Sequence, residues 1–278
     1  MRPEIKFTEE QLLDIKQSYS TGESTVKIGK RYGTSHQPIL KALKKMGVER
    51  TPGKFNRKYN LNENYFDIVD TPNKAYILGL LYADGSNNIS KSTISISLQE
   101  EDGYLLEAIR NEIQSGKPLE YLDYSNKHDY GYNYKNQYRL SLFSSHMCHT
   151  LNNLGMMPNK SLKLEVPNLR QDLYSHFIRG YFDGDGSLCV RHTADGLFRG
   201  ITTITSTEMF CRKIQSIIKE SIDIPCGNIY DASCKNGITR VLAISGRIQN
   251  QKFYEWIYKD ADLYLQRKRE KVNDLYIA

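Results

Sequence analysis

Two stretches of the sequence end an apolar run with a carboxylate set between glycines: YILGLLYADGS at residues 76–86 and FIRGYFDGDGS at residues 177–187. The last aspartates of the two runs, Asp84 and Asp185, lie 101 residues apart. Paired carboxylates are hard oxygen donors, and Mg²⁺ accepts a few such ligands while it keeps water for phosphate chemistry. The two aspartates are therefore candidate ligands of a divalent cation.

Small residues in both stretches recur at helical spacing and so share one helix face. They are Gly79 and Ala83 in the first stretch and Gly180 and Gly184 in the second. Close packing of two helices explains this pattern, but it does not explain a negative charge at the C-terminal end of each helix, which the helix dipole disfavours. If the small faces pack together, Asp84 and Asp185 become neighbours that repel each other. A shared proton can offset this repulsion, but a bound divalent cation is the less costly answer at neutral pH.

Two other metal sites are weaker candidates. The stretch DGDGS opens like a calcium loop, but the loop pattern started at Asp183 requires a glycine where Leu188 stands and a glutamate where Ala194 stands. In HMCH, at residues 146–149, three neighbouring side chains on a short helix do not point to one centre. The five cysteines form no CxxC pair, so neither a zinc ribbon nor a disulfide framework is expected.

The elements around the two stretches repeat in the same order. Each stretch predicts a helix that is followed by two strands, a helix, two strands and a helix, so the expected fold class is α+β with two pseudo-symmetric αββαββα repeats. The later elements are expected at residues 93–99, 101–114, 119–124, 138–143 and 145–154 in the first repeat, and at 188–192, 201–206, 207–220, 228–232, 239–245 and 250–259 in the second. A last helix is expected over residues 261–276. Its segment YLQRKREK is expected to be a solvated basic face, with phosphate contact as the lesser alternative.

The N-terminal 49 residues predict three short helices. Thr8 and Gln11 have the spacing of a capping box, and Gly33 is a natural left-handed stop for the second helix. Ser35 then precedes a third, basic helix. A helix, a tight turn with glycine and a second basic helix are similar to a helix-turn-helix DNA reader. The expected base contacts are His36 and Gln37, and the expected phosphate contacts are Lys41, Lys44 and Lys45.

Positive charge is concentrated in the same part of the chain. Residues 1–60 hold 13 Lys and Arg against 6 Asp and Glu, a net charge of +7, whereas the remainder holds 25 against 26. This excess suits a polyanion such as nucleic acid, with a solvated basic face as the alternative. Residues 50–62 combine Pro, Gly and basic residues without apolar periodicity, which indicates a linker. Through Arg57 and Lys58 this linker could follow a DNA groove.

These patterns give four expected segments: a helix-turn-helix domain at 1–49, a basic linker at 50–71, a first repeat at 72–165 and a second repeat at 166–278. The N-terminus has no apolar signal-peptide core. No apolar run approaches the roughly 20 residues that a membrane helix needs. We therefore expect a cytoplasmic protein with no membrane partner.

The segments ILGLLYADG and IRGYFDGDG both resemble the motif of the LAGLIDADG homing endonucleases, and the element order after each copy resembles that family's repeat over residues 72–278. The resemblance implies one monomer whose two motif helices form the interface between the repeats. It implies two antiparallel sheets bent into saddles over the DNA major groove. The implied chemistry is hydrolysis of one phosphodiester on each strand, assisted by a divalent metal held by the last aspartate of each motif.

Carried over residue by residue, the family's metal carboxylates fall on Asp84 and Asp185. The carbonyl groups just before them, those of Ala83 and Gly184, are the further ligands that the resemblance implies. Asp183 stands at the sixth motif place, where the first copy has Tyr82. That place is not needed for the metal, so we expect Asp183 to pack or to cap.

Other catalytic positions match the family less closely. Gln99 stands where the family often keeps a polar residue that holds active-site water, and Ser206 stands there in the second repeat. The family's frequent lysine after the fourth strand has no match, because Ser144 and Gly246 fall near the two expected places, with Ser145 and Arg247 beside them. Slow cleavage and cleavage of a single strand therefore stay open.

The strand TISISLQ at residues 93–99 alternates apolar and polar side chains, so Ser95, Ser97 and Gln99 share one face. A polar face of short side chains suits the reading of base edges, although a solvated face is equally common. Arg139 and Arg240 add donors from other strands. The remaining basic candidates for DNA contact are Lys135, in the tyrosine-rich stretch 124–139, and Arg191 and Arg199.

The function that these features indicate is a site-specific double-strand DNA endonuclease that uses Mg²⁺, with Mn²⁺ as a substitute. It would act as a monomer on a long target, pseudo-palindromic or asymmetric. The alternatives are a non-catalytic DNA-binding regulator and an intron RNA maturase on the same scaffold. The sequence begins with Met1 and ends LYIA, without a nucleophile at the first residue or a terminal His-Asn pair. We therefore expect a free-standing or intron-encoded form and not an intein.

Overall fold

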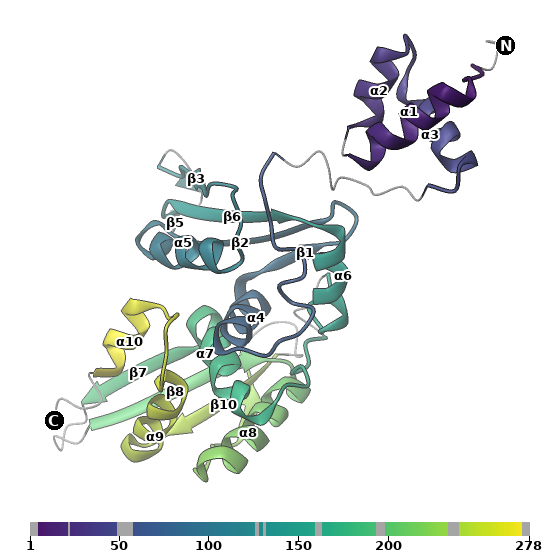
Figure 1. Cartoon of the computed structure of the whole chain (residues 1–278). Coiled ribbons are helices and arrows are strands. Elements are labelled where there is room, and N and C mark those ends of the chain that lie inside the picture. Colours follow the sequence, from purple (N-terminus) through teal and green to yellow (C-terminus); the bar gives the residue numbers. More distant parts are fainter. Residues whose placement is uncertain are drawn as a thin grey trace. The chain divides into compact units, whose positions relative to one another are not determined.

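The computed structural model describes residues 5–21, 23–48, 58–125, 128–129, 132–158, 163–192, 198–232 and 239–273. The chain forms two compact units, Met1–Asn60 and Leu61–Ala278 (Figure 1). None of the described helices is long and apolar enough to cross a membrane.

The described residues of the first unit form three helices, α1 (Glu9–Ser20), α2 (Thr25–Arg31) and α3 (His36–Lys45). The expected capping box is present, because the Thr8 hydroxyl accepts from the backbone of Gln11 while the Gln11 side chain accepts from the backbone of Thr8. Gly33, with φ +63°, ends α2 in the left-handed conformation. The core of this unit consists of Ile15, Tyr19, Ile28, Ile39 and Leu43.

The second unit contains both repeats, and each repeat has the expected order of helices and strands. The first repeat runs α4 (Pro72–Asp84), β1 (Ser86–Asn88), β2 (Thr93–Gln99), α5 (Gly103–Glu112), β3 (Glu120–Leu122), β6 (Gln137–Phe143) and α6 (Ser145–Asn153). The second runs α7 (Tyr174–Asp185), β7 (Ser187–His192), β8 (Phe198–Ser206), α8 (Glu208–Ile222), β9 (Ile229–Asp231), β10 (Arg240–Ser245) and α9 (Arg247–Tyr258). The elements outside this pattern include the short strands β4 (His128–Asp129) and β5 (Tyr132–Asn133), the helix α10 (Gln266–Asn273) and two short 3-10 helices, Glu100–Asp102 and Gln171–Leu173.

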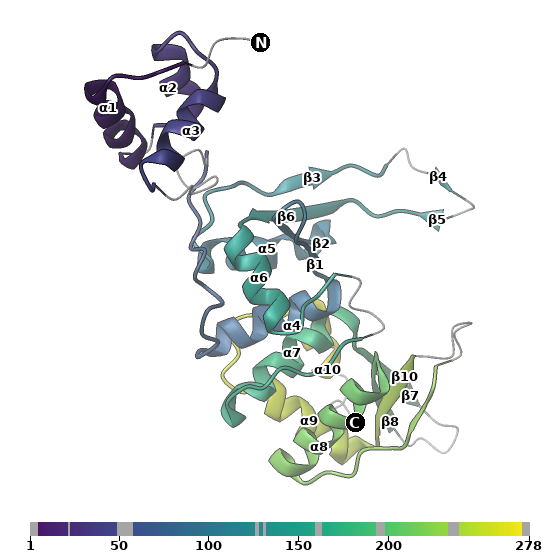
Figure 2. The same ribbon diagram turned by 90° about the vertical axis from the view of Figure 1, so that its right-hand side faces the viewer.

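Each repeat builds one four-stranded antiparallel sheet, with the order β1-β2-β6-β3 in the first and β7-β8-β10-β9 in the second. The order is the same in both, so the α+β class and the pseudo-symmetric repeats are confirmed. In β2 the apolar side chains are buried and the polar ones half-exposed, in strict alternation. A two-stranded hairpin, β4–β5, lies beyond the ends of β3 and β6 (Figure 2).

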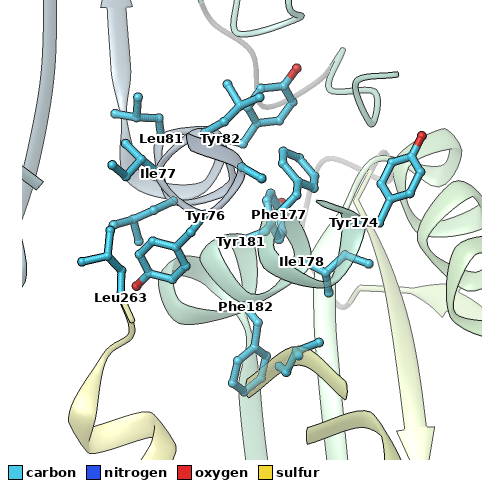
Figure 3. Packing of buried hydrophobic residues seen from close by; sticks show 14 of the residues in the cluster. Tyr76, Ile77, Leu81, Tyr82, Tyr174, Phe177, Ile178, Tyr181, Phe182 and Leu263 are labelled. Carbon is cyan, nitrogen blue, oxygen red and sulfur yellow. The ribbon is translucent and has the colours of Figure 1, made fainter. Parts of the chain in front are cut away.

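The two motif helices, α4 and α7, pack directly on each other between the two sheets (Figure 1). A Cβ atom at Gly79 would lie 2.0 Å from the carbonyl oxygen of Phe177, and one at Gly180 would lie 2.0 Å from that of Tyr76. The two backbones therefore touch at places that only glycine permits. Aromatic side chains fill the space around this contact, as the neighbouring rings of Tyr82 and Phe177 show (Figure 3).

The expected linker at 50–71 needs a correction in its second half. The boundary between the compact units falls after Asn60, and residues 61–71 belong to the second unit. Tyr65 and Phe66 are buried in its core, and the Tyr65 hydroxyl donates to Glu112 at 3.1 Å. Two aromatic side chains in a polar stretch gave no periodic signal, so their burial could not be read from the sequence. The residues 49–57 lie outside the described part of the chain.

Candidate functional site

The two motif aspartates stand at equivalent ends of the crossing helices. Asp84 is the last residue of α4 and Asp185 the last of α7, and each is followed by a glycine in extended conformation that leads directly into a strand. A Cβ atom at Gly184 would lie 3.0 Å from Oδ2 of Asp84. The Asp84 carboxylate of α4 therefore lies against the backbone of Gly184 in α7, the residue that precedes Asp185.

The sixth motif place of the second copy belongs to the core and not to the cation site. Asp183 is fully buried and accepts from the hydroxyls of Tyr76 at 2.8 Å and Tyr258 at 2.9 Å. It also accepts from the backbone N–H of Leu265 at 2.8 Å. Burial raises the pKa of Asp183 to about 6, and the three donors oppose that rise. The packing role expected for Asp183 agrees with these contacts.

A cation that the sequence did not suggest reaches the end of α7. Lys268 of α10 donates its Nζ to the carbonyl oxygens of Phe182 at 2.6 Å, Gly184 at 3.2 Å and Gly186 at 2.6 Å. Burial is the main cause that lowers the pKa of Lys268 to about 8, and Asp84 and Asp185 are among the carboxylates that oppose this. Lys268 therefore lies within electrostatic reach of both motif aspartates.

This finding corrects the expectation that YLQRKREK forms a solvated basic face. Lys268 turns inward, whereas Arg267 and Lys271 are exposed. A signal was present, because Leu265 and Val272 stand three residues before and four after Lys268 and so share its helix face. Two buried apolar neighbours at helical spacing indicate that a lysine between them lies on the inner face.

A tyrosine is a second group that sequence reasoning missed. Tyr181 belongs to α7, and its hydroxyl donates to the carbonyl oxygen of Thr205 at 3.0 Å. Its pKa is raised by burial first, and the negative charges of Asp185 and Asp84 add to the rise. The aromatic ring belongs to the core, and the hydroxyl is within electrostatic reach of both carboxylates.

Gln99 and Ser206 hold matching places in the two sheets. Gln99 ends β2 and pairs with the first residue of β6, and Ser206 ends β8 and pairs with the first residue of β10. Gln99 accepts from Nζ of Lys135 at 3.1 Å, and the same ammonium lies 3.2 Å from Glu101. These three side chains line an open cleft on the first repeat.

Neither expected place for the family's lysine carries an ammonium group. Ser144 is buried, caps α6 and donates to Glu63 at 2.6 Å. Gly246, with φ +100°, precedes α9, and Arg247 beside it is exposed. Ser145, the first residue of α6, offers a hydroxyl.

The polar face of the first sheet includes a cross-strand contact, since Nε of Arg139 donates to the hydroxyl of Ser97 at 3.1 Å. Ser95 is half-exposed on the same face. In the second sheet, Arg240 lies 2.8 Å from Asp231 and 3.6 Å from Glu208, so acidic neighbours balance its charge. The arginines are thus placed in similar strands with different partners.

The remaining candidates for DNA contact are distributed over both units. His36 and Gln37 are exposed in the first turn of α3, and their Nε2 atoms lie 3.2 Å apart. Exposed along the same helix are Lys41, Lys44 and Lys45. Lys58 is exposed. Arg191 and Arg199 pair across β7 and β8, but their side chains lie outside the described part of the structure, as does the whole of Arg57.

The donor set fits a hard divalent cation only in part. Among the described residues, no group of three or more His, Cys, Asp or Glu side chains could hold a metal. The available donors are the two motif carboxylates and the carbonyl groups of Ala83 and Gly184, which are the oxygen ligands that Mg²⁺ accepts. The Gly184 carbonyl already accepts from Lys268.

No protein-family model matches the chain, and no curated protein sequence matches it. Solved structures that are similar to it include the I-LtrWI LAGLIDADG homing endonuclease bound to target DNA, at a TM-score of 0.48 and 12% identity over 78% of this chain and 90% of that one. The LAGLIDADG meganuclease I-AabMI bound to uncleaved DNA gives 0.47 and 14% over 74% and 89%. Meganuclease I-SmaMI bound to uncleaveable DNA gives 0.46 and 13% over 74% and 88%. These likenesses are distant, and the fold and site described above rest on the chain's own contacts.

Proposed function

We propose that the protein is a site-specific DNA endonuclease in which Asp84 and Asp185 together hold divalent cations where the two motif helices cross. The observation that carries this proposal is the position of the Asp84 carboxylate against the backbone of Gly184. Positive charge stabilises two carboxylates at the C-terminal ends of two packed helices, and a divalent cation is one source of that charge. A nuclease site that takes one aspartate from each copy would require both copies of the motif.

The cation of this proposal is Mg²⁺, with Mn²⁺ as a substitute, and its further ligands would be the carbonyl groups of Ala83 and Gly184. When bound, a divalent cation supplies positive charge to the phosphate and lowers the pKa of water. The chain's own residues orient the reactants. Gln99 and Ser206 stand at matching ends of β2 and β8. From there each side chain can hold a water molecule against one of the two DNA strands.

The proposed DNA surface consists of the polar sheet faces and the basic three-helix unit. Short hydroxyl side chains such as Ser95 and Ser97 leave room for base edges, and Arg139 beside them can reach guanine. The helix-turn-helix would extend the target through α3. Contacts by Lys58, Lys135, Arg191 and Arg199 are part of the same proposal, as are a monomeric state and a cytoplasmic location. Because the two repeats differ in sequence, the target would be long and at most pseudo-palindromic.

A non-catalytic DNA-binding regulator is the second candidate function. It is favoured by the side chains at the two expected lysine places, which are a buried serine and a glycine. An intron RNA maturase would use the same scaffold. The three functions differ in what the protein does to nucleic acid in the presence of Mg²⁺.

The discriminating experiment incubates the protein and Mg²⁺ with a plasmid that carries the DNA flanking its own gene, joined without the insertion. A defined cut supports the endonuclease, a mobility shift without a cut supports the regulator, and selective binding of intron RNA supports the maturase. Chelation of the metal should abolish the cut and leave the shift within severalfold. Asp84→Asn and Asp185→Asn should abolish the cut as well, and Asp223→Asn is their matched control, because Asp223 directly follows helix α8, is exposed and is far from the motif in the sequence.

A further inference from the structure

Three backbone carbonyl groups converge on Lys268 at the end of the second motif helix. They belong to Phe182, Gly184 and Gly186, at 2.6, 3.2 and 2.6 Å from Nζ. Two of these residues flank Asp185 directly. The ammonium group therefore holds the backbone on both sides of the proposed metal ligand.

The position of Lys268 is built by contacts to both repeats. The backbone N–H of Leu265 donates to Asp183 of α7 at 2.8 Å, and that of Gln266 donates to the Tyr104 hydroxyl of α5 at 2.6 Å. Nε of Arg267 donates to Asp102 at 2.9 Å, and the Asp102 side chain is 3% exposed. Three consecutive residues are thus fixed, and the fourth, Lys268, is directed to the end of α7.

One of these three carbonyl groups, that of Gly184, is also a proposed ligand of the divalent cation. The Gly184 carbonyl is the ligand that pairs with Asp185, and it accepts from Lys268. Asp84 and Asp185 both act on Lys268 as nearby negative charges. An ammonium group in this place offsets the repulsion between the two carboxylates, and it also repels a second cation.

We propose that the Lys268 ammonium group occupies the second half of the site. It positions Asp185, and it competes with Mg²⁺ for the Gly184 carbonyl group and for the electrostatic attraction of Asp84 and Asp185. This inference rests on the proposed function, since it assigns the second motif to metal binding. The simpler alternative is a lysine that only caps a helix end. The two differ in what happens to Mg²⁺ binding when the charge is removed.

The test measures the Tm of the full chain against Mg²⁺ concentration, without DNA, for the natural protein, Lys268→Met and Lys268→Arg. Lys268→Met keeps an unbranched side chain of nearly the same length and loses its charge. We expect it to lower the Tm in the absence of Mg²⁺, because three charge-assisted hydrogen bonds are lost and the carboxylates repel. We expect its Tm to respond to about tenfold lower Mg²⁺ than the natural protein, since the competing charge is gone. Lys268→Arg keeps the charge and should respond like the natural protein.

Two controls make the outcome specific. Lys271→Met removes an exposed lysine from the same helix and should change neither quantity. Adding Asp185→Asn to Lys268→Met should remove the increased sensitivity of the Tm to Mg²⁺, because the carboxylate that would bind Mg²⁺ is lost. A helix-capping lysine without the proposed role gives a lower Tm with an unchanged or weaker Mg²⁺ response, and that result overturns the proposal.

If Lys268→Met does not fold, Lys268→Gln, which keeps a neutral NH2 donor group, takes its place with the same expectation. The result separates this inference from the proposed function. An Mg²⁺ response that depends on Lys268, in a protein that does not cut DNA, contradicts the endonuclease alone. A metal-dependent cut in a protein whose Mg²⁺ response ignores Lys268 contradicts this inference alone.

Discussion

The two motif helices have the same backbone geometry. Their side chains differ on the face that packs against the C-terminal part of the same repeat. In α7 this face carries His176, Arg179 and Asp183, all buried. The places 101 residues earlier, in α4, carry Ala75, Leu78 and Tyr82. The first motif is thus apolar where the second is charged.

The charged face binds the chain that follows α9. Arg179 is fully buried, and its guanidinium donates to the carbonyl oxygens of Ile257 at 2.7 Å and Leu263 at 3.0 Å. Asp183 accepts from Leu265. The result is a fixed path from α9 to α10, which carries Lys268 to the motif.

The first motif needs no such network, because the chain after α6 is held differently. The Tyr82 hydroxyl donates to the carbonyl oxygen of Leu154. The Asn87 side chain donates to the carbonyl oxygens of Cys148 and Met156, both at 2.9 Å. The methyl group of Met156 lies beside Gly85, where a Cβ atom would be 2.8 Å from it. An apolar methyl group thus covers the end of the first motif, whereas an ammonium group covers the second.

The backbone contact between the motif helices is the feature that the two copies share, so its loss should be equally severe in either. Gly79→Ala and Gly180→Ala each place a Cβ atom 2.0 Å from a carbonyl oxygen, which forces the helices apart. We expect each to cost about 3 kcal/mol or more, a fall in Tm of roughly 6 °C or more. Ala83→Gly, at the equivalent of Gly184, is the control and should cost about 1 kcal/mol. A clear difference between the two glycine variants in thermal unfolding would break the symmetry described here.

At the sixth motif place, which is Tyr82 in the first copy and Asp183 in the second, the two substitutions should reduce stability by unequal amounts. Asp183→Ala leaves three buried donors without their acceptor, and we expect a loss of about 3–4 kcal/mol. Tyr82→Phe leaves one carbonyl group without its donor, and we expect about 1 kcal/mol. Denaturant unfolding of both variants measures the ratio. Equal losses would mean that the buried carboxylate contributes no more than a single hydroxyl.

A pH dependence should belong to the second repeat alone. Burial, and then the neighbouring Arg179, lower the pKa of His176 to about 4. The unfolded chain therefore binds more protons between pH 4 and 6.5, so this residue contributes stability above pH 6.5 that is lost as the pH falls toward 4. Against His176→Ala, which copies Ala75, the natural protein should lose about 2–3 kcal/mol of its relative stability over that interval. A difference in unfolding free energy that stays constant from pH 7 to pH 4 contradicts a neutral, buried His176.

The smallest expected effect compares the two sheets as DNA surfaces. Arg139 contacts a neutral serine, whereas Arg240 is balanced by Asp231 and Glu208. Arg139→Ala should weaken DNA binding by about tenfold, as the loss of one contact to guanine predicts. Arg240→Ala should weaken it by a few-fold at most. Titration of labelled DNA at several salt concentrations measures both, and a larger loss for Arg240 would reverse the proposed order.

Local patterns were sufficient to predict most of this fold. The strand at 93–99 matches β2 at both ends, because strict alternation over seven residues has one interpretation. The two small-residue faces also indicated the pairing of α4 with α7. Capping signals at Thr8 and Gly33 located the ends of short helices.

Long-range contacts account for what the sequence did not show. Residues 61–71 pack through Tyr65 and Phe66, whose partners lie far along the chain. The helix α10 starts at Gln266, later than expected, because residues 263–265 are held in place by Arg179 and Asp183 of α7. The partners of Lys268 are also more than 80 positions away, so only the spacing of Leu265 and Val272 on its helix face indicated that it lies inward.

The most direct test of the account is single-turnover cleavage of the natural flanking DNA, with the two strands labelled separately, by Asp84→Asn and Asp185→Asn. Both substitutions keep the shape of the carboxylate and remove its charge. We predict that each lowers Mg²⁺-dependent cleavage by about a thousandfold or more while DNA binding stays within severalfold, since a metal ligand is lost and the DNA surface is kept. Undiminished cutting of both strands by both variants would contradict the assignment of the two motif aspartates as the catalytic metal ligands.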